Sequence, residues 1–295
     1  MGYLLSIAET CGLNAILALS VYATFMVGQF SLAQVGFWAI GAYVTGILVA
    51  LYGFALLPAL LVAALICACL GVILGYPCLR IRGIYLAMAT IAFAEVVRIF
   101  WSNFTWQALV AGKIVGPGGP LGFLGIPVMT NWVQIFSVLI LLIGLFLWLE
   151  RSRFGLAARS VREDEVAAAS VGINIVAMKV GAFALGAAVA AVGGGLYATY
   201  VSSVTADNFN FHLGLISVFF VAVGGSQRAF GPVLGAIVLT ILPDALRFTG
   251  DFRMVWYGLV VLAITVTFPQ GIYGGLQRLH TLLRGGQVKV LAEHR

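Results

Sequence analysis

A series of apolar runs, each close to the length that crosses a lipid bilayer, constrains the fold most strongly. An α-helix needs about 20 apolar residues to cross the hydrocarbon core. Nine such runs lie near residues 5–27, 30–52, 54–76, 83–101, 132–149, 178–201, 207–224, 232–248 and 255–272. The seventh is short and polar at its start, so we expect a re-entrant or broken helix there. The sequence predicts an all-α, polytopic integral membrane protein with about 8–10 transmembrane helices, in a single transmembrane domain over residues 1–295.

The composition excludes an ordinary water-soluble domain. Hydrophobic residues make up 62% of the chain and charged residues 9%, whereas soluble domains contain about half apolar and about a quarter charged residues. The net charge of +6 does not indicate a nucleic-acid partner, because the basic residues cluster in loops. The four cysteines match no zinc spacing, so we expect no metal.

The basic residues also predict the orientation in the membrane. If the spans alternate in direction, twelve of the sixteen Lys and Arg residues share one face, which the positive-inside rule makes cytoplasmic. The twelve are Arg80, Arg82, Arg151, Arg153, Arg159, Arg162, Lys179, Arg228, Arg278, Arg284, Lys289 and Arg295. This arrangement puts the N-terminus outside and a tail, residues 273–295, in the cytoplasm. A multi-pass protein of a bacterial inner membrane has this pattern.

The long loop 102–131 then lies on the opposite, periplasmic face. It is rich in Gly and Pro and poor in charge, and Trp101, Trp106 and Trp132 flank it as an interfacial aromatic belt. Two interpretations remain open. The loop is either a turn-rich connector, or a cover over a pathway mouth and a landing surface for an external partner.

The charge-dense stretch 150–178 is the one large polar interruption. With Lys179 it holds nine charged residues, and inserting them at the membrane centre would cost on the order of 25 kcal/mol. Ser160 and Glu163 form a capping-box pattern, and Gly172 can end the helix that follows. A helix of about eleven residues is unstable alone. Its acidic first turn favours a groove on a protein over the membrane interface.

Two loops on the same predicted face interrupt the apolar pattern, Gly28–Gln34 and Gly224–Gly231. Both suit helix breaks whose freed backbone groups line a polar translocation path. The candidate path residues are Gln29, Ser31, Gln34, Gly224, Gly225 and Ser226. Ordinary tight turns packed against neighbouring helices explain the same pattern.

Two acid–arginine pairs, Glu95/Arg98 and Asp244/Arg247, lie late in their spans on the periplasmic side. Each pair is one helical turn apart and close enough to bond. Side chains near a span end can reach the interface, which makes a structural role the simpler interpretation. A functional role would be to hold the amino and carboxylate groups of a zwitterion, or to dock a binding protein.

No sequence motif indicates catalysis or nucleotide binding. The chain contains no P-loop, because Ile114 follows Gly112-Lys113 where a hydroxyl residue is required. We therefore expect no catalytic residue, no cofactor and no enzymatic activity in this chain. A stand-alone channel or ion-coupled transporter would place ionisable residues at mid-span, and a scaffold or enzyme subunit would cluster polar groups. Neither pattern is present.

Motifs along most of the chain resemble those of the M-type permease subunits of branched-chain amino acid ABC importers. They are Gly28–Gln34, Gly41–Tyr43, Leu79–Ala87, Ala92–Glu95, Arg162–Asn174, Gly224–Ser226 and Gly231–Ala236. The resemblance implies ATP-driven alternating access for branched-chain amino acids, or for urea or short-chain amides, which similar permeases import. It also implies four partners in addition to membrane lipid: a second, related permease, two ATPase subunits that bind ATP and magnesium, and a periplasmic amino-acid-binding protein.

The same resemblance implies a role for the polar stretch. In that family the matching segment is a coupling helix that seats in a groove on an ATPase subunit. The residues expected to dock are Arg162, Glu163, Asp164, Glu165, Ala168 and Gly172.

Overall fold

The computed structural model describes residues 2–78, 81, 83–110, 113–267 and 271–275. Within them, nine apolar helices match the nine predicted runs. They are α1 (Gly2–Phe25), α2 (Gln34–Ala50), α3 (Leu56–Cys78), α4 (Ile84–Asn103), α5 (Trp132–Arg151), α8 (Ile175–Val201), α9 (Phe211–Gly224), α10 (Phe230–Ala245) and α11 (Arg253–Thr267). Five of the described helices, α1, α3, α4, α5 and α8, are long and apolar enough to cross a membrane. An all-α, polytopic membrane fold is thereby confirmed.

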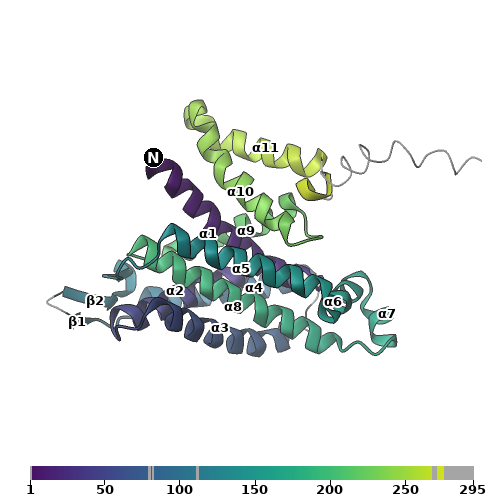
Figure 1. The fold of residues 1–295 in the computed structure, drawn as a ribbon, viewed down its shortest axis with the longest axis horizontal. Helices are drawn as coiled ribbons and strands as arrows, with labels where there is room; N and C mark the ends of the chain where they lie inside the picture. Colours follow the sequence, from purple (N-terminus) through teal and green to yellow (C-terminus); the bar gives the residue numbers. More distant parts are fainter. Residues whose placement is uncertain (1, 79–80, 82, 111–112, 268–270, 276–295) are drawn as a thin grey trace, which may run out of the picture.

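Helix α8 lies at the centre and packs against α1, α2 and α3 (Figure 1). Its small residues bring main chains into direct contact. A Cβ atom added to Gly194 would lie 2.0 Å from the Trp38 carbonyl oxygen, and one added to Gly41 would lie 2.4 Å from Ala191 Cα. Small residues permit this close approach of membrane helices. The sequence spacing of Ala187, Ala191 and Gly195 predicts such a packing face.

The seventh apolar run is broken, as expected. A short 3-10 helix, η2 (Ala206–Phe209), precedes α9, and Asn210 caps α9 by accepting a hydrogen bond from Leu213 N at 3.1 Å. Helix α9 has 14 residues, which span about 21 Å. That length is shorter than the hydrocarbon core of a bilayer, about 30 Å thick. A second 3-10 segment, η3 (Leu246–Phe252), joins α10 to α11.

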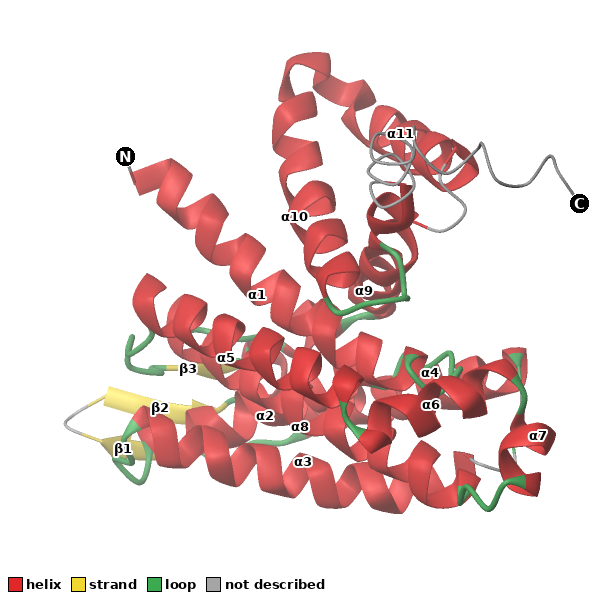
Figure 2. Ribbon diagram, turned by 45° about the vertical axis from the view of Figure 1, so that its right-hand side comes forward, coloured by secondary structure: helices red, strands yellow, loops and turns green. Residues whose placement is uncertain are grey.

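The loop 102–131 contains strands that the sequence did not predict. β1 (Ala108–Val110), β2 (Lys113–Pro117) and β3 (Phe123–Leu124) form an antiparallel sheet in the order β1-β2-β3, with η1 (Gly119–Leu121) before β3. Phe123 N donates to Val204 O at 2.7 Å, which ties the sheet to the segment after α8. The sheet lies at one end of the helix bundle, called here the sheet end (Figure 2).

Helices α6 (Arg153–Glu163) and α7 (Glu165–Ser170) lie at the other end, called here the α6/α7 end (Figure 1). The prediction of one helix capped by Ser160 is wrong. Ser160 lies inside α6, where its hydroxyl donates to Leu156 O at 3.2 Å. Asp164 adopts extended dihedral angles and accepts hydrogen bonds from Val166 N and Ala167 N, at 2.8 and 3.1 Å. A carboxylate is a strong N-cap, so the break falls at Asp164.

The structure describes six of the twelve basic residues that the sequence predicts to share one face. Arg80, Arg82 and the basic residues of the tail, Arg278, Arg284, Lys289 and Arg295, lie outside the described residues. The remaining six lie in the last turn of α5, in α6, in the first turns of α8, and in the turn before α10. These segments meet at the α6/α7 end, so the described arrangement supports the predicted orientation.

Candidate functional site

Helix α7 presents a small exposed face beyond the bundle (Figure 1). Val166 and Val171 are 79% and 76% exposed, and Glu163 and Asp164 are exposed beside them. Gly172 ends the segment at φ +84°, a conformation that favours glycine. Of the six residues expected to dock, Glu163, Asp164 and Gly172 are therefore accessible to a partner.

The other three expected docking residues are buried or half-buried in this chain, and their docking role stays a prediction. Ala168 is only 2% exposed. Glu165 is half-buried and accepts a hydrogen bond from Lys179 Nζ at 2.7 Å, which ties α7 to α8. Arg162 is half-buried, and its guanidinium binds the Ser226 carbonyl. The break at Asp164 separates α7 from α6, so the segment expected to dock is not one continuous helix.

Arg162 contacts both of the loops that the sequence singles out. Its Nη1 donates to Ser226 O at 3.0 Å. Its side chain also lies against Gly28, where an added Cβ atom would come within 3.2 Å of Arg162 Cγ. Gly28 has φ +74°, so both the close approach and the backbone conformation favour glycine. Helix α6 thus contacts the turn after α1 and the turn after α9.

Glu150, in the last turn of α5, forms a second connection at the same end. It is 5% exposed, and its Oε1 accepts hydrogen bonds from Tyr22 OH at 2.7 Å and from Ala229 N at 2.6 Å. Ala229 precedes the first turn of α10, where the helix dipole stabilises negative charge. One carboxylate therefore joins α1, α5 and α10. Sequence reasoning missed this role, although an acid at the end of an apolar span is a usable signal.

The segment between α1 and α2 is a helix break in the protein interior. Leu32 N donates to Thr90 Oγ1 of α4 at 3.1 Å, and Ser31 Oγ accepts from Ala33 N at 3.2 Å. Gln29 and Gln34 are buried, and Gln29 Oε1 and both polar atoms of the Gln34 amide have no hydrogen-bond partner within the described structure. Each such group costs about 1–3 kcal/mol when left unsatisfied. Polar groups facing the interior in this way are expected of a translocation path.

The turn after α9 differs from the helix break between α1 and α2, because close main-chain contacts at glycines form it. An added Cβ atom at Gly224 would lie 2.0 Å from Gly231 O, and Gly225 has φ +105°. The glycines therefore bring the ends of α9 and α10 together, which is the tight-turn interpretation. Ser226 is half-buried, and its carbonyl is the group that Arg162 binds.

The two acid–arginine pairs differ in the structure. Arg98 bonds to Glu95 through Nε at 3.0 Å and to Asp207 of η2 through Nη1 at 2.6 Å. No ion pair or hydrogen bond joins Asp244 to Arg247 in the part of the chain that the structure describes. Helix α10 ends at Ala245 and Arg247 belongs to η3, so the helical spacing that predicts this contact does not extend to Arg247. That prediction is wrong.

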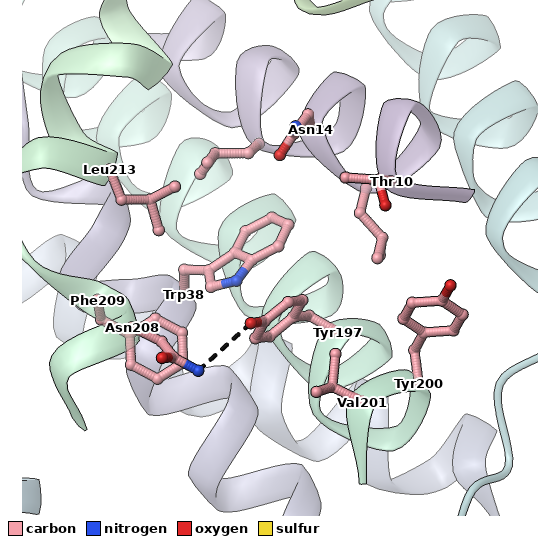
Figure 3. Close-up of a pocket in the computed structure, with 11 residues that line it drawn as sticks. Thr10, Asn14, Trp38, Tyr197, Tyr200, Val201, Asn208, Phe209 and Leu213 are labelled. Carbon is pink, nitrogen blue, oxygen red and sulfur yellow. Dashed lines mark hydrogen bonds between the residues drawn. The ribbon is translucent and has the colours of Figure 1, made fainter. Parts of the chain in front are cut away.

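A cavity of about 180 Å³ lies between α1, α2, α8, η2 and α9 (Figure 3). Aromatic and aliphatic side chains line most of it, with polar groups among them. The lining residues are Thr10, Leu13, Asn14, Leu17, Trp38, Tyr197, Tyr200, Val201, Asn208, Phe209 and Leu213. Tyr200 OH donates to Glu9 Oε2 at 2.8 Å, and Asn208 Nδ2 donates to Tyr197 OH at 3.4 Å. The residues come from five separate elements, so no local motif could reveal the cavity.

Comparison with known proteins identifies the family. The family model described as branched-chain amino acid transport system / permease component matches residues 3–268. The high-affinity branched-chain amino acid transport system permease protein LivM of Salmonella typhimurium is 30% identical over 94% of this chain and 69% of its own length. The LivM protein of Escherichia coli shows the same values.

A probable branched-chain amino acid transport permease protein LivH of Methanocaldococcus jannaschii is 26% identical over 89% of each chain. No solved structure matches. Since the family model covers most of the sequence and the fold is that of a polytopic membrane protein, the chain belongs to the branched-chain amino acid transport permease family.

Proposed function

We propose that this chain is a transport subunit, with no enzymatic activity of its own, of an ABC importer for branched-chain amino acids in a bacterial inner membrane. One observation carries the proposal. The exposed face of α7 lies beyond the bundle, and the adjoining α6 is bonded through Arg162 to the turn after α9 and packs against the turn after α1. A partner that pulls on α7 therefore acts on two interior turns.

We infer four protein partners. Of two cytoplasmic ATPase subunits, which bind ATP and magnesium, one would contact the exposed face of α7. A second, related permease would complete the path across the membrane. A periplasmic amino-acid-binding protein would dock at the sheet end, where the loop 102–131 and the Arg98–Asp207 ion pair are located. Closure of the ATPases would bias a two-state equilibrium of the permeases.

A substitution on the exposed face of α7 tests this proposal. Val166→Asp puts a charge on a side chain that is 79% exposed, so the fold should tolerate it. We expect normal insertion in the membrane, loss of ATPase subunits on co-purification, and loss of ATP-dependent uptake. The matched control is Val128→Asp, the same change at a 65% exposed residue of the loop 102–131. Equal ATPase recovery from the two variants would reject the docking role of α7.

The cavity beside α1 supports the proposed substrate. An aromatic and aliphatic lining with a few hydroxyl and amide groups is typical of sites for small, largely apolar ligands. A branched-chain amino acid has an apolar side chain for Trp38 and Phe209 and polar groups for Tyr200 and Asn208. Urea and short-chain amides lack a side chain of that size and would leave the aromatic lining without contacts. The cavity therefore favours branched-chain amino acids over these alternatives.

Filling the cavity tests the substrate assignment. Leu213 is half-buried and lines the cavity. Leu213→Trp should reduce leucine uptake strongly without reducing ATPase recovery, whereas Leu213→Met, which nearly conserves volume, should have little effect. Uptake of urea in preference to leucine by the wild-type importer would favour the amide alternative. Uptake by vesicles that contain this chain alone, without nucleotide, would instead indicate a stand-alone channel.

A further inference from the structure

A second cavity at the α6/α7 end is lined by three arginines. It has a volume of about 460 Å³ and lies where α5, α6 and the turn before α10 meet. Its lining residues are Leu147, Glu150, Arg151, Leu156, Arg159 and Arg228. It is separate from the cavity beside α1, with which it shares no residue.

The charges of this cavity are unbalanced. Glu150 is its one acid, and its Oε1 already accepts hydrogen bonds from Tyr22 and Ala229. No carboxylate of the described residues lies within ion-pair distance of Arg151, Arg159 or Arg228. The cavity therefore has an excess of two positive charges, and guanidinium groups bind phosphate oxygens in pairs of parallel hydrogen bonds.

The surroundings of the cavity are apolar and exposed. Leu156 is 61% exposed, and Trp148, in the last turn of α5, is 67% exposed. Few residues of α5 are buried within this chain, so most of its apolar surface is exposed, as expected of a helix in contact with lipid. A tryptophan at the end of such a helix marks the level of the lipid headgroups. The arginines thus lie at the depth where phospholipid phosphates occur, beside a surface suited to acyl chains.

We propose that this cavity binds the phosphate headgroup of an anionic phospholipid. Arg151, Arg159 and Arg228 hold the phosphate, and Leu156 and Trp148 contact the first part of the acyl chains. Basic pockets at the cytoplasmic side of membrane helices bind anionic lipid headgroups in this way. The exposed face of α7 lies farther along the chain, beyond α6 (Figure 1), so the two surfaces serve different ligands.

The bound lipid would also connect two segments at the α6/α7 end. Arg159 belongs to α6, whereas Arg228 belongs to the turn before α10. A phosphate between them adds a third connection to those made by Arg162 and Glu150. Anionic lipid therefore strengthens the contact between α6 and that turn.

Native mass spectrometry of the full-length chain in mild detergent tests the proposal, with phosphatidylglycerol and phosphatidylcholine of the same acyl chains as probes. We expect preferential retention of phosphatidylglycerol and a reduction of about fivefold in Arg228→Gln, the equivalent of about 1 kcal/mol for one arginine near the surface. Arg153→Gln is the matched control, because Arg153 is exposed on α6 but does not line the cavity. The thermal midpoint of each variant verifies its folding.

Four results would overturn the proposal. The first is equal retention of the two lipids by the wild-type chain. The second is the same retention of phosphatidylglycerol by Arg228→Gln and Arg153→Gln. The third is binding of free glycerol phosphate as tight as that of the lipid, which would assign the cavity to a soluble phosphate compound. If lipid retention is unchanged while ATPase recovery falls in Arg228→Gln, the cavity contacts a protein and the lipid assignment is rejected.

Discussion

Removal of the Glu150 carboxylate should destabilise the protein, and a second substitution that is itself destabilising should then restore stability. Glu150→Ala leaves two buried donors, Tyr22 OH and Ala229 N, without the acceptor that they share at 2.7 and 2.6 Å. An orphaned buried donor costs about 1–3 kcal/mol, so we expect a loss of about 2–6 kcal/mol. Glu150→Gln keeps an oxygen at the same place and loses only the charge. Neutral hydrogen bonds are about half as strong as charged ones, so Glu150→Gln should lose some stability. The loss should be smaller than in Glu150→Ala, because an acceptor remains.

A second substitution should then restore stability. Tyr22→Phe keeps the ring, which packs edge-on against Phe146 with centroids 5.7 Å apart, but removes the hydroxyl. In the wild-type chain it should destabilise, because it removes a hydrogen bond. In the Glu150→Ala chain it should raise stability by about 1–3 kcal/mol, because it removes the orphaned group.

The assay is the thermal midpoint of the purified permease in one detergent, measured for the wild type, the two single variants and the double variant. The four values form a double-mutant cycle that isolates the Tyr22–Glu150 interaction. Glu150→Gln gives the intermediate value that separates the effect of charge from the effect of the lost acceptor. Additive losses in the double variant would refute the reasoning, since they would mean that the two side chains do not share a hydrogen bond.

Three further predictions concern other parts of the molecule. Arg162→Ala should abolish most ATP-dependent uptake while ATPase recovery on co-purification stays normal, because α7 remains exposed. Gly194→Ala should lower the thermal midpoint strongly, since its Cβ would lie 2.0 Å from the Trp38 carbonyl oxygen, whereas Gly144→Ala, with no atom within 4 Å, should not. Lys179→Met should remove the 2.7 Å contact with Glu165 and increase hydrogen exchange in α7.

The apolar helices were predictable because the signal for a membrane span is local. The length and hydropathy of each run can be read from its own residues, and the seventh run could be expected to be broken because it is short and polar at its start. The division between α6 and α7 was harder, because Ser160 and Asp164 are both good N-caps. Which of the two residues caps a helix depends on the packing of Val161 and Ala168, which are both buried. No local sequence pattern reveals this packing.

The contacts of the site join residues that are distant in the sequence. Glu150 is 128 residues from Tyr22 and 79 from Ala229, and Arg162 is 64 from Ser226. Single-sequence patterns carry no information on such pairs. The sheet of the loop 102–131 was missed for a related reason, because its strands have two to five residues and one of them pairs with Val204.

The contact between α8 and α2 has a consequence for any conformational cycle. Main-chain atoms, rather than side chains, form much of this contact at Gly41 and Gly194, so no change of rotamer can absorb a shift between the two helices. Interfaces packed in this manner move as units. In the proposed transport cycle the α2–α8 pair would therefore move as one body, and a shift between these two helices would require their main chains to separate.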